Sequence, residues 1–236
     1  MRQMEIKPIL FNTEMVRAIL DGRKSCTRRV VKFPVNRYTN NVPLADKMIL
    51  QELRCDKAIF LEEPFFSFGM NLPYQPGDIL YVRETWHKYT KRVGEGENCH
   101  LAEFYGYKAS VANSEDAGEP WKPSIHMPKE AARIWLKVTD VRVERLQEID
   151  EDGVWDEGFR FKPSCLTRVS ADGRTCDLDG PCTSSIKYCD MTMGELFGRE
   201  LWNNTIKKSD MDRYGWDANP WVWVIEFERC EKPEGV

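Results

Sequence analysis

Short strand-like segments dominate this sequence, and long stretches rich in turn residues separate them in place of regularly spaced helices. The clearest strand-like segments are 79–86, 132–146 and 219–227. The clearest patterns typical of helices lie within 9–22, 148–157 and 192–201. A doubly wound parallel sheet needs a helix after nearly every strand. The spacing therefore disfavours that class and predicts an α+β fold around a small, mostly antiparallel β-barrel.

The helical segments carry end signals. Asn12 or Thr13 is placed to cap the first helix and Gly22 to end it, because a side-chain oxygen accepts the unpaired N–H groups of a first turn and glycine tolerates the backbone of a helix end. Thr192 and Glu195 form a capping-box pattern at the start of the last helical segment. These signals predict three short helices.

Three stretches interrupt the pattern and are interpreted as loop insertions into one domain that spans residues 1–236. They cover about 33–73, 89–120 and 160–190. The first contains several prolines and no sustained periodicity apart from a helix-like pattern around 45–53. The second is rich in Gly, Glu and Ser, a composition typical of loops.

Charge and hydropathy exclude two classes of protein. Lys plus Arg is 34 and Asp plus Glu is 38, which gives a net charge of −4, so a general DNA-coating protein is not expected and any nucleic-acid site must be a local patch. Apolar runs reach four or five residues, against the roughly 18 that a membrane span needs. The N-terminus lacks the apolar stretch of a secretory signal. We expect a cytoplasmic protein with no membrane partner.

Four of the eight cysteines lie in the third insertion: Cys165, Cys176, Cys182 and Cys189. Their spacing lacks the C-x2-C pair of standard zinc sites. Reduced thiols are one interpretation, because cytosolic cysteines stay reduced. A structural zinc that holds the insertion together is the other.

The segment Gly22-Arg23-Lys24-Ser25-Cys26-Thr27-Arg28-Arg29 follows the first helical pattern. A helix ending in Gly-Arg-Lys, with a Thr three residues after the Lys and an Arg two after the Thr, resembles the signature of the ASCH domains of the PUA-like superfamily. These are small β-barrels linked to RNA and modified-nucleoside chemistry. The Gly77-Asp78 turn and the closing strand 223–227 resemble the same family.

The wider pattern resembles the longer ASCH proteins of phages and prophages, for which the location would be the host cytoplasm. The stretches that carry this resemblance are 82–86, 123–128 and 219–221. In all, the resemblance covers about half of the chain, and the three insertions lie outside it. Its coverage is 6–32, 74–88, 121–159 and 192–228.

One branch of this family removes the acetyl group of N4-acetylcytidine with a Lys, a Thr and a Glu. The resemblance places these roles on Lys24, Thr27 and Glu157. The competing carboxylates of the same acidic stretch are Glu151, Asp152 and Asp156. A threonine hydroxyl becomes a nucleophile when a base takes its proton, and a lysine serves as that base when burial or nearby cations weaken its hold on a proton. The alternative is that these residues form ion pairs without catalysis.

Further ligand-binding candidates are Arg23, Arg28, Arg29, Arg83, Glu84, Trp86 and His126. The arginine fork suits a phosphate or an oxyanion, but a run of cations is also typical of a solvated loop. Trp86 suits either a pocket wall or the core, and His126 suits either the site or a loop anchor.

The resemblance thus implies recognition of RNA, single-stranded nucleic acid or a modified nucleoside in a basic cleft. Hydrolysis of an N-acylated cytidine is an alternative, and ribonuclease activity is a third.

Overall fold

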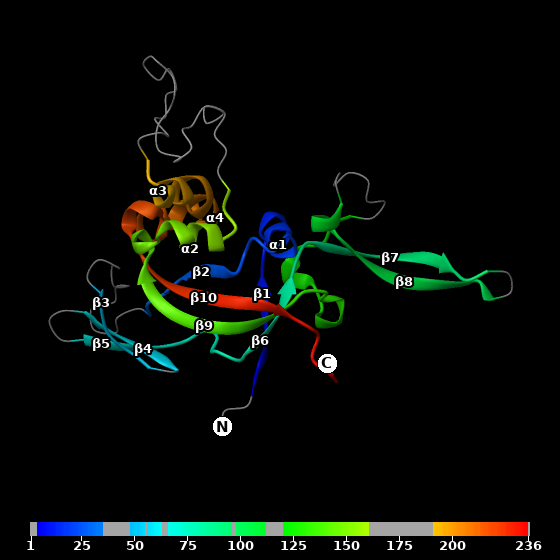
Figure 1. The fold of residues 1–236 in the computed structure, drawn as a ribbon, viewed down its shortest axis with the longest axis horizontal. Coiled ribbons are helices and arrows are strands. Elements are labelled where there is room, and N and C mark those ends of the chain that lie inside the picture. The colour runs from blue at the N-terminus through cyan, green and yellow to red at the C-terminus, as the bar shows by residue number, and fades with distance from the viewer. Residues whose placement is uncertain are drawn as a thin grey trace, which may run out of the picture. The chain divides into compact units, whose positions relative to one another are not determined.

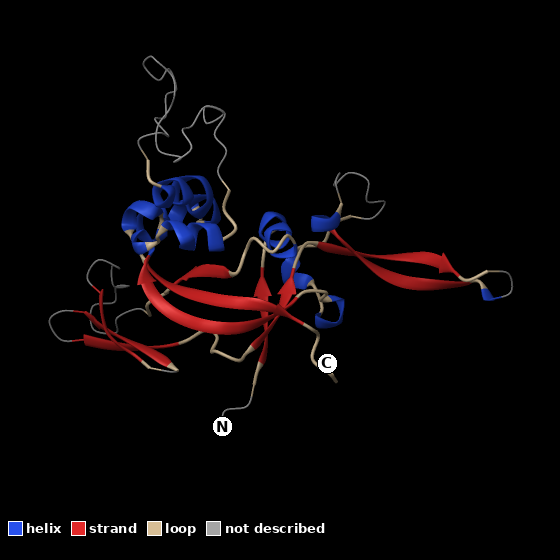
Figure 2. Cartoon of the chain, viewed as in Figure 1, coloured by secondary structure: helices blue, strands red, loops and turns tan. Residues whose placement is uncertain are grey.

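The computed structural model describes residues 4–34, 48–54, 56–62, 66–95, 98–111, 120–160 and 191–235. This part of the chain is a mixed α+β structure made mostly of strands (Figures 1 and 2), which confirms the predicted class. The chain divides into two compact units. The first comprises Met1–Ser25, Tyr74–Asp140 and Glu226–Val236, and the second comprises Cys26–Pro73 and Val141–Ile225.

The main sheet has the strand order β1-β6-β9-β10-β2. Its strands are β1 (Ile6–Leu10), β2 (Cys26–Val30), β6 (Ile79–Arg83), β9 (Trp135–Arg145) and β10 (Trp221–Cys230). Both β9 and β10 pass from one unit into the other. In the described residues β1 and β2 are the two ends of this order, and a closed PUA-like barrel stays a prediction.

In the first unit, β1 pairs with β6 in parallel, with Ile6 opposite Ile79. Strand β6 then pairs antiparallel with β9, and Leu80 lies opposite Leu136. Helix α1 (Thr13–Leu20) follows β1, and its first turn donates from Met15 N to Asn12 Oδ1 over 2.8 Å. Asn12 is therefore the cap, as one of the two predicted alternatives stated, and the helix ends before Gly22.

In the residues that the structure describes, the second predicted insertion contains a β-hairpin where a loop was predicted. Strand β7 (Trp86–Val93) pairs antiparallel with β8 (His100–Tyr107) along its whole length (Figure 1). Gly94 and Glu95 follow the first strand, whereas Glu103 and Gly106, which also indicated a loop, lie within β8. The strands themselves are held by cross-strand pairs, two of them aromatic: Tyr89 with Phe104 and Trp86 with Tyr107.

The helix-like pattern at 45–53 is also corrected. Residues 48–53 form strand β3 (Met48–Leu53), which pairs with β4 (Lys57–Glu62), and β4 pairs with β5 (Phe66–Asn71). Met48 is buried, and its carbonyl accepts hydrogen bonds from Trp221 Nε1 at 2.8 Å and Arg145 Nη2 at 3.0 Å. The segment is thus a strand through its pairing with the neighbouring β4, and contacts distant in sequence anchor its first residue.

Short helices complete the second unit. They are α2 (Glu151–Asp156), α3 (Met193–Phe197), α4 (Asn203–Thr205) and α5 (Met211–Tyr214), with a π-helical turn at Gly198–Trp202. The capping box of Thr192 and Glu195 is present as predicted. Leu146, Val154, Phe197, Trp202 and Trp216 form a core with the inner face of β10. Within the described ranges, no helix has the length and apolar character that crossing a bilayer requires.

Single 3-10 turns join several of these elements. They are Lys108–Ser110, Ser124–His126, Lys129–Ala131, Leu146–Glu148, Lys208–Asp210 and Trp216–Ala218.

The core of the second unit makes a testable prediction at Gly198. A Cβ at this position would lie 2.1 Å from Cδ2 and 2.5 Å from Cγ of Trp216. Alanine favours a helix by about 1 kcal/mol over glycine, but overpacking costs about 1–3 kcal/mol, and Cγ lies too close to its backbone to move away. We expect Gly198→Ala to lower the free energy of unfolding by about 1–2 kcal/mol in urea denaturation.

Gly69→Ala is the matched control in the same unit, because nothing lies within 4 Å of its added Cβ. Its unfolding free energy should stay within about 0.5 kcal/mol of wild type. Equal effects of the two substitutions would show that the contact with Trp216 does not limit this position.

Candidate functional site

Strand β2 carries the second half of the Gly22–Arg29 motif. Cys26, Thr27 and Arg28 are all buried. Successive side chains of a strand point to opposite faces, so Cys26 and Arg28 share one face and Thr27 and Arg29 share the other. The motif therefore serves both faces of its strand, and Thr27 is turned away from Arg28.

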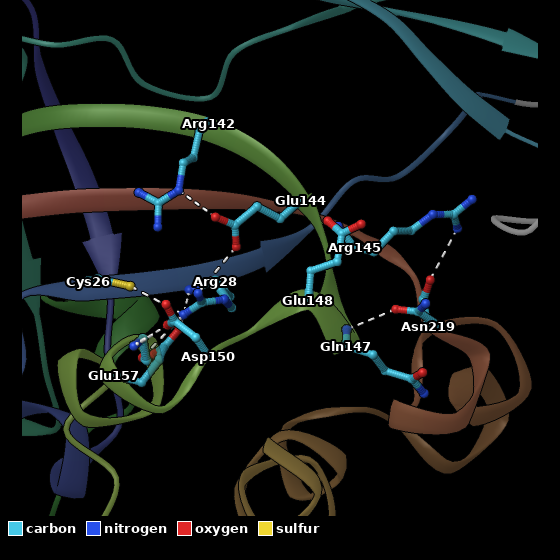
Figure 3. A network of polar contacts seen from close by, with 11 residues as sticks. Cys26, Arg28, Arg142, Glu144, Arg145, Gln147, Glu148, Asp150, Glu157 and Asn219 are labelled. Atoms are coloured by element: carbon cyan, nitrogen blue, oxygen red, sulfur yellow. Dashed lines mark hydrogen bonds and ion pairs between the residues drawn. The ribbon is translucent and has the colours of Figure 1, made fainter. Parts of the chain in front are cut away.

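Arg28 is the centre of a buried polar network in the second unit (Figure 3). Its side chain is 2% exposed. Nη1 donates to Cys26 Sγ at 3.5 Å and to Gly153 O at 3.4 Å, and Nη2 donates to Glu144 Oε2 at 3.3 Å. Nε is buried with no hydrogen-bond partner among the described residues. Both terminal nitrogens of the guanidinium are thus used inside the protein.

Glu157 meets β2 directly. Its Oε1 accepts a hydrogen bond from Arg28 N at 2.6 Å and lies 3.6 Å from Arg28 Nη1. Glu157 directly follows helix α2, whose first turn is capped by Asp150 Oδ1 accepting from Gly153 N at 2.7 Å. Because the cap and the buried Val154 fix this helix, the carboxylate that follows it has a defined position.

The structure separates Glu157 from its three competitors. Glu151, Asp152 and Asp156 are exposed, whereas Glu157 is 4% exposed. The carboxylate chosen through the family resemblance is therefore the buried one and the one that reaches the motif. The role assigned to it stays a prediction.

Glu144 extends the network along β9. Its Oε1 accepts from Arg142 Nε at 2.5 Å while its Oε2 faces Arg28 (Figure 3). Two arginines and two glutamates thus alternate in one chain of contacts. Buried charges are tolerated when they are paired in this way. Because two carboxylates balance its charge, the Arg28 guanidinium is not available to bind a phosphate.

Lys24 and Arg23 belong to the first unit. The backbone N–H groups of both donate to Ala18 O, at 3.1 and 2.8 Å, in a tight turn after α1. Lys24 is 4% exposed, and its Nζ lies 5.8 Å from the centre of the Phe11 ring, a distance at which a cation is attracted to an aromatic face. Arg23 pairs with Asp21 at 2.8 Å at the surface.

A second buried carboxylate of the first unit is Glu84. Its two oxygens accept from Arg133 Nε at 2.8 Å and Nη2 at 2.9 Å, a bidentate pair. Val82, Glu84 and Trp86 are buried while the alternate residues are half-buried. Glu84 is thus fully engaged with a protein partner.

The other candidates of this unit have packing and anchoring contacts. Trp86 is 6% exposed and packs against Tyr105, at 5.8 Å between ring centres, which supports the core interpretation. Arg83 donates to the carbonyls of Met127, at 2.8 Å, and Ile125. It thereby holds the turn that carries His126, which is exposed.

Asp78, in the turn shared with the family pattern, is a structural carboxylate. It is 2% exposed and lies 3.1 Å from Lys7 Nζ. Burial lowers the pKa of Lys7, but its hydrogen bonds to Glu5 and Asp78 outweigh this and raise the pKa overall. This ion pair ties β1 to the start of β6.

The cysteines proposed as zinc ligands, Cys165, Cys176, Cys182 and Cys189, lie outside the described residues. Within the described ranges, no group of three or more His, Cys, Asp or Glu side chains is placed to hold a metal ion. A structural zinc in the third insertion stays a prediction.

Comparison of the chain with family models, curated proteins and solved structures gives no match. The site is therefore interpreted from its own residues.

The buried network predicts a large cost for breaking one pair. Glu157→Ala leaves Arg28 with one carboxylate fewer and removes the acceptor of its backbone N–H. Loss of one partner of a buried ion pair costs about 3–5 kcal/mol, and we expect that loss in the free energy of unfolding measured by urea. The double variant Arg28→Met/Glu157→Leu should recover at least half of it, because apolar residues of similar size leave no unpaired charge.

The control is the exposed pair of Lys88 and Glu103, 2.7 Å apart with side chains 40% and 65% exposed. Glu103→Ala should cost less than about 1 kcal/mol. If Glu157→Ala costs no more than Glu103→Ala, the network does not support the fold.

Proposed function

We propose that the chain recognises a modified nucleoside, free or within a nucleic-acid strand, with residues of the Gly22–Arg29 motif and Glu157. This is the function that the resemblance to ASCH domains of the PUA-like superfamily implies. The small PUA-like barrel and the phage or prophage type of ASCH protein are part of the same proposal.

One observation carries the proposal: where the buried polar side chains lie. The buried polar and charged residues of the described chain are Lys24, Thr27, Arg28, Asp78, Glu84 and Glu157. All six fall in stretches that carry the resemblance, and four of them belong to the motif or its predicted carboxylate. Burial of charged groups is costly, and such groups concentrate at functional sites. The resemblance rests on sequence motifs and not on burial, so the burial of these residues supports the proposal independently.

Glu157 points to the class of nucleoside. One carboxylate oxygen is fixed by Arg28 N at 2.6 Å, so the carboxylate has little freedom to turn. Carboxylates accept hydrogen bonds from the N4 amino group of cytosine. Glu157 is therefore the proposed acceptor for the N4 group of a cytidine, and the modification at N4 is what the resemblance to ASCH domains implies.

A second candidate function is hydrolysis of the amide of an N4-acylated cytidine. Thr27 and Glu157 support it, because both are buried in the second unit and Glu157 binds the peptide N–H that follows Thr27. In this reaction the Thr27 oxygen bonds to the acyl carbon as a base takes its proton, the role that the resemblance gives to Lys24. The C–N bond breaks, and the cytosine amine leaves with a proton supplied through Glu157. Water then splits the acyl-threonine ester and regenerates the hydroxyl.

The proposal is tested with N4-acetylcytidine, cytidine and uridine by calorimetric titration. We expect N4-acetylcytidine to bind most tightly and Glu157→Gln to weaken it about tenfold, since a good contact to a base edge is worth about 1–3 kcal/mol. Glu151→Gln is the matched control, an exposed glutamate of the same acidic segment, and should bind as wild type. No binding of any of the three nucleosides by folded wild-type protein would refute the proposal.

Acetate release separates the two functions. If the chain is a hydrolase, wild type releases acetate and Thr27→Val, which lacks only the hydroxyl, binds without release. If wild type binds without release, recognition alone is its function. Equal release by wild type and Thr27→Val excludes Thr27 as the nucleophile.

A further inference from the structure

The hairpin of β7 and β8 has two faces of different character. Residues directly opposite each other in an antiparallel pair share a face, and Tyr89 lies opposite Phe104. The face that contains this pair, called here the aromatic face, is formed by His87, Tyr89, Lys91, Val93, His100, Ala102, Phe104 and Gly106. It belongs wholly to the first unit and contains no residue of the proposed nucleoside site.

Four rings form a row at one end of this face. Trp121 and His87 are 4.6 Å apart between ring centres, His87 and Tyr89 are 5.4 Å apart, and Tyr89 and Phe104 are 5.8 Å apart with 27° between their planes. Tyr89 and Phe104 are each 36% exposed. The row therefore ends in two stacked rings that are open to solvent.

Gly106 makes room for the histidine of this row. A Cβ at position 106 would lie 1.9 Å from His87 Nε2, so the imidazole rests directly on the backbone of β8. His87 Nδ1 is buried and has no hydrogen-bond partner among the described residues. The ring is thus held by packing between Gly106 and Trp121, and the row is a preformed surface.

The aromatic face carries one cation and no carboxylate. Its eight positions include Lys91 and two histidines and no Asp or Glu, and Lys91 is exposed. The opposite face carries Lys88 and Arg92 and one carboxylate, Glu103, which pairs with Lys88 at 2.7 Å. Lys91 lies on the same face as the exposed rings of Tyr89 and Phe104, and this face has no carboxylate that would repel a phosphate. Such a face complements the phosphates and bases of a nucleic-acid strand.

We propose that the aromatic face binds single-stranded nucleic acid, with bases stacked on Tyr89 and Phe104 and Lys91 near a phosphate. Aromatic rings beside cations are how proteins hold single strands without reading sequence. Duplexes are disfavoured because their bases are already stacked on one another and offer no open ring face. An apolar protein partner would gain little from the uncompensated charge of Lys91.

The test measures anisotropy of labelled oligo(U) and oligo(dT) of about 12 nucleotides, near the upper end of single-strand site sizes. Phe104→Leu and Tyr89→Leu keep an apolar side chain and remove the ring, and each should weaken binding about tenfold. Both oligomers should bind with similar affinity, because stacking does not read the 2′-hydroxyl.

Lys91 and Arg92 provide a matched pair, since they are neighbours in β7 on opposite faces. Lys91→Ala should weaken binding and reduce the slope of log affinity against log salt by about 1. Arg92→Ala should change affinity by less than about twofold and leave the slope unchanged. Circular dichroism on each variant confirms that the hairpin variants are folded.

Several outcomes would overturn the proposal. They are absence of binding to either oligomer, tighter binding of a duplex of the same length, unchanged binding by both leucine variants, or equal effects of Lys91→Ala and Arg92→Ala. Glu157→Gln should bind the oligomers as wild type does, so failure of the nucleoside site leaves this result unaffected. Loss of oligomer binding in Glu157→Gln, in protein that circular dichroism shows to be folded, would place the strand at the motif instead and refute a separate aromatic site.

Discussion

The second unit depends on how the buried charge of Arg28 is balanced. Its guanidinium contacts Glu144 on β9 and both Gly153 O and Glu157 at α2, so one side chain from β2 joins elements more than 100 residues away. Apolar contacts are non-directional, whereas the N–H groups of a buried guanidinium need acceptors at defined positions, because an unmatched buried donor costs about 1–3 kcal/mol. The position of α2 against β2 is therefore set by polar geometry as well as by apolar packing.

This constraint also divides the motif by function. The contacts of the Arg28 guanidinium stabilise the fold. Successive side chains of β2 point to opposite faces, so Thr27 lies on the other face. Glu157 contributes both to the fold and to the proposed site, because its Oε1 accepts a hydrogen bond from Arg28 N, the backbone N–H that follows Thr27. A carboxylate held in this way is preorganised, and preorganised groups lose little entropy when a ligand binds. The same hydrogen bond that supports the fold thus prepares the proposed acceptor.

Sequence patterns predicted the features that depend on residues close together in the chain, such as helix caps and strand periodicity. Asn12, Thr192 and Glu195 cap their helices as expected, and the burial of Val82, Glu84 and Trp86 follows the period of a strand. Predicting Glu157 required the family pattern, because nothing in the local sequence distinguishes it from the three neighbouring carboxylates. The partners Glu144, Arg142 and Arg133 were missed, because a polar residue at an alternate strand position is indistinguishable from a solvated one until the facing element is known. Strands β3 and β8 were missed because most of their side chains are exposed or half-buried, so neither shows the apolar alternation by which a half-buried strand is recognised.

The hairpin of β7 and β8 lies outside the motif, and its own stability explains why aromatic rings lie at its surface. A two-stranded ribbon is marginally stable in water, and most side chains of β7 and β8 are exposed. Cross-strand aromatic pairs such as Tyr89 with Phe104 stabilise such ribbons by about 0.2–1 kcal/mol each. The rings that hold the strands together must then stay at the surface, because no further layer of described residues covers them. A stacking surface thus arises from the same requirement that keeps the hairpin folded, and a bound base would cover the apolar area that the hairpin alone leaves in water.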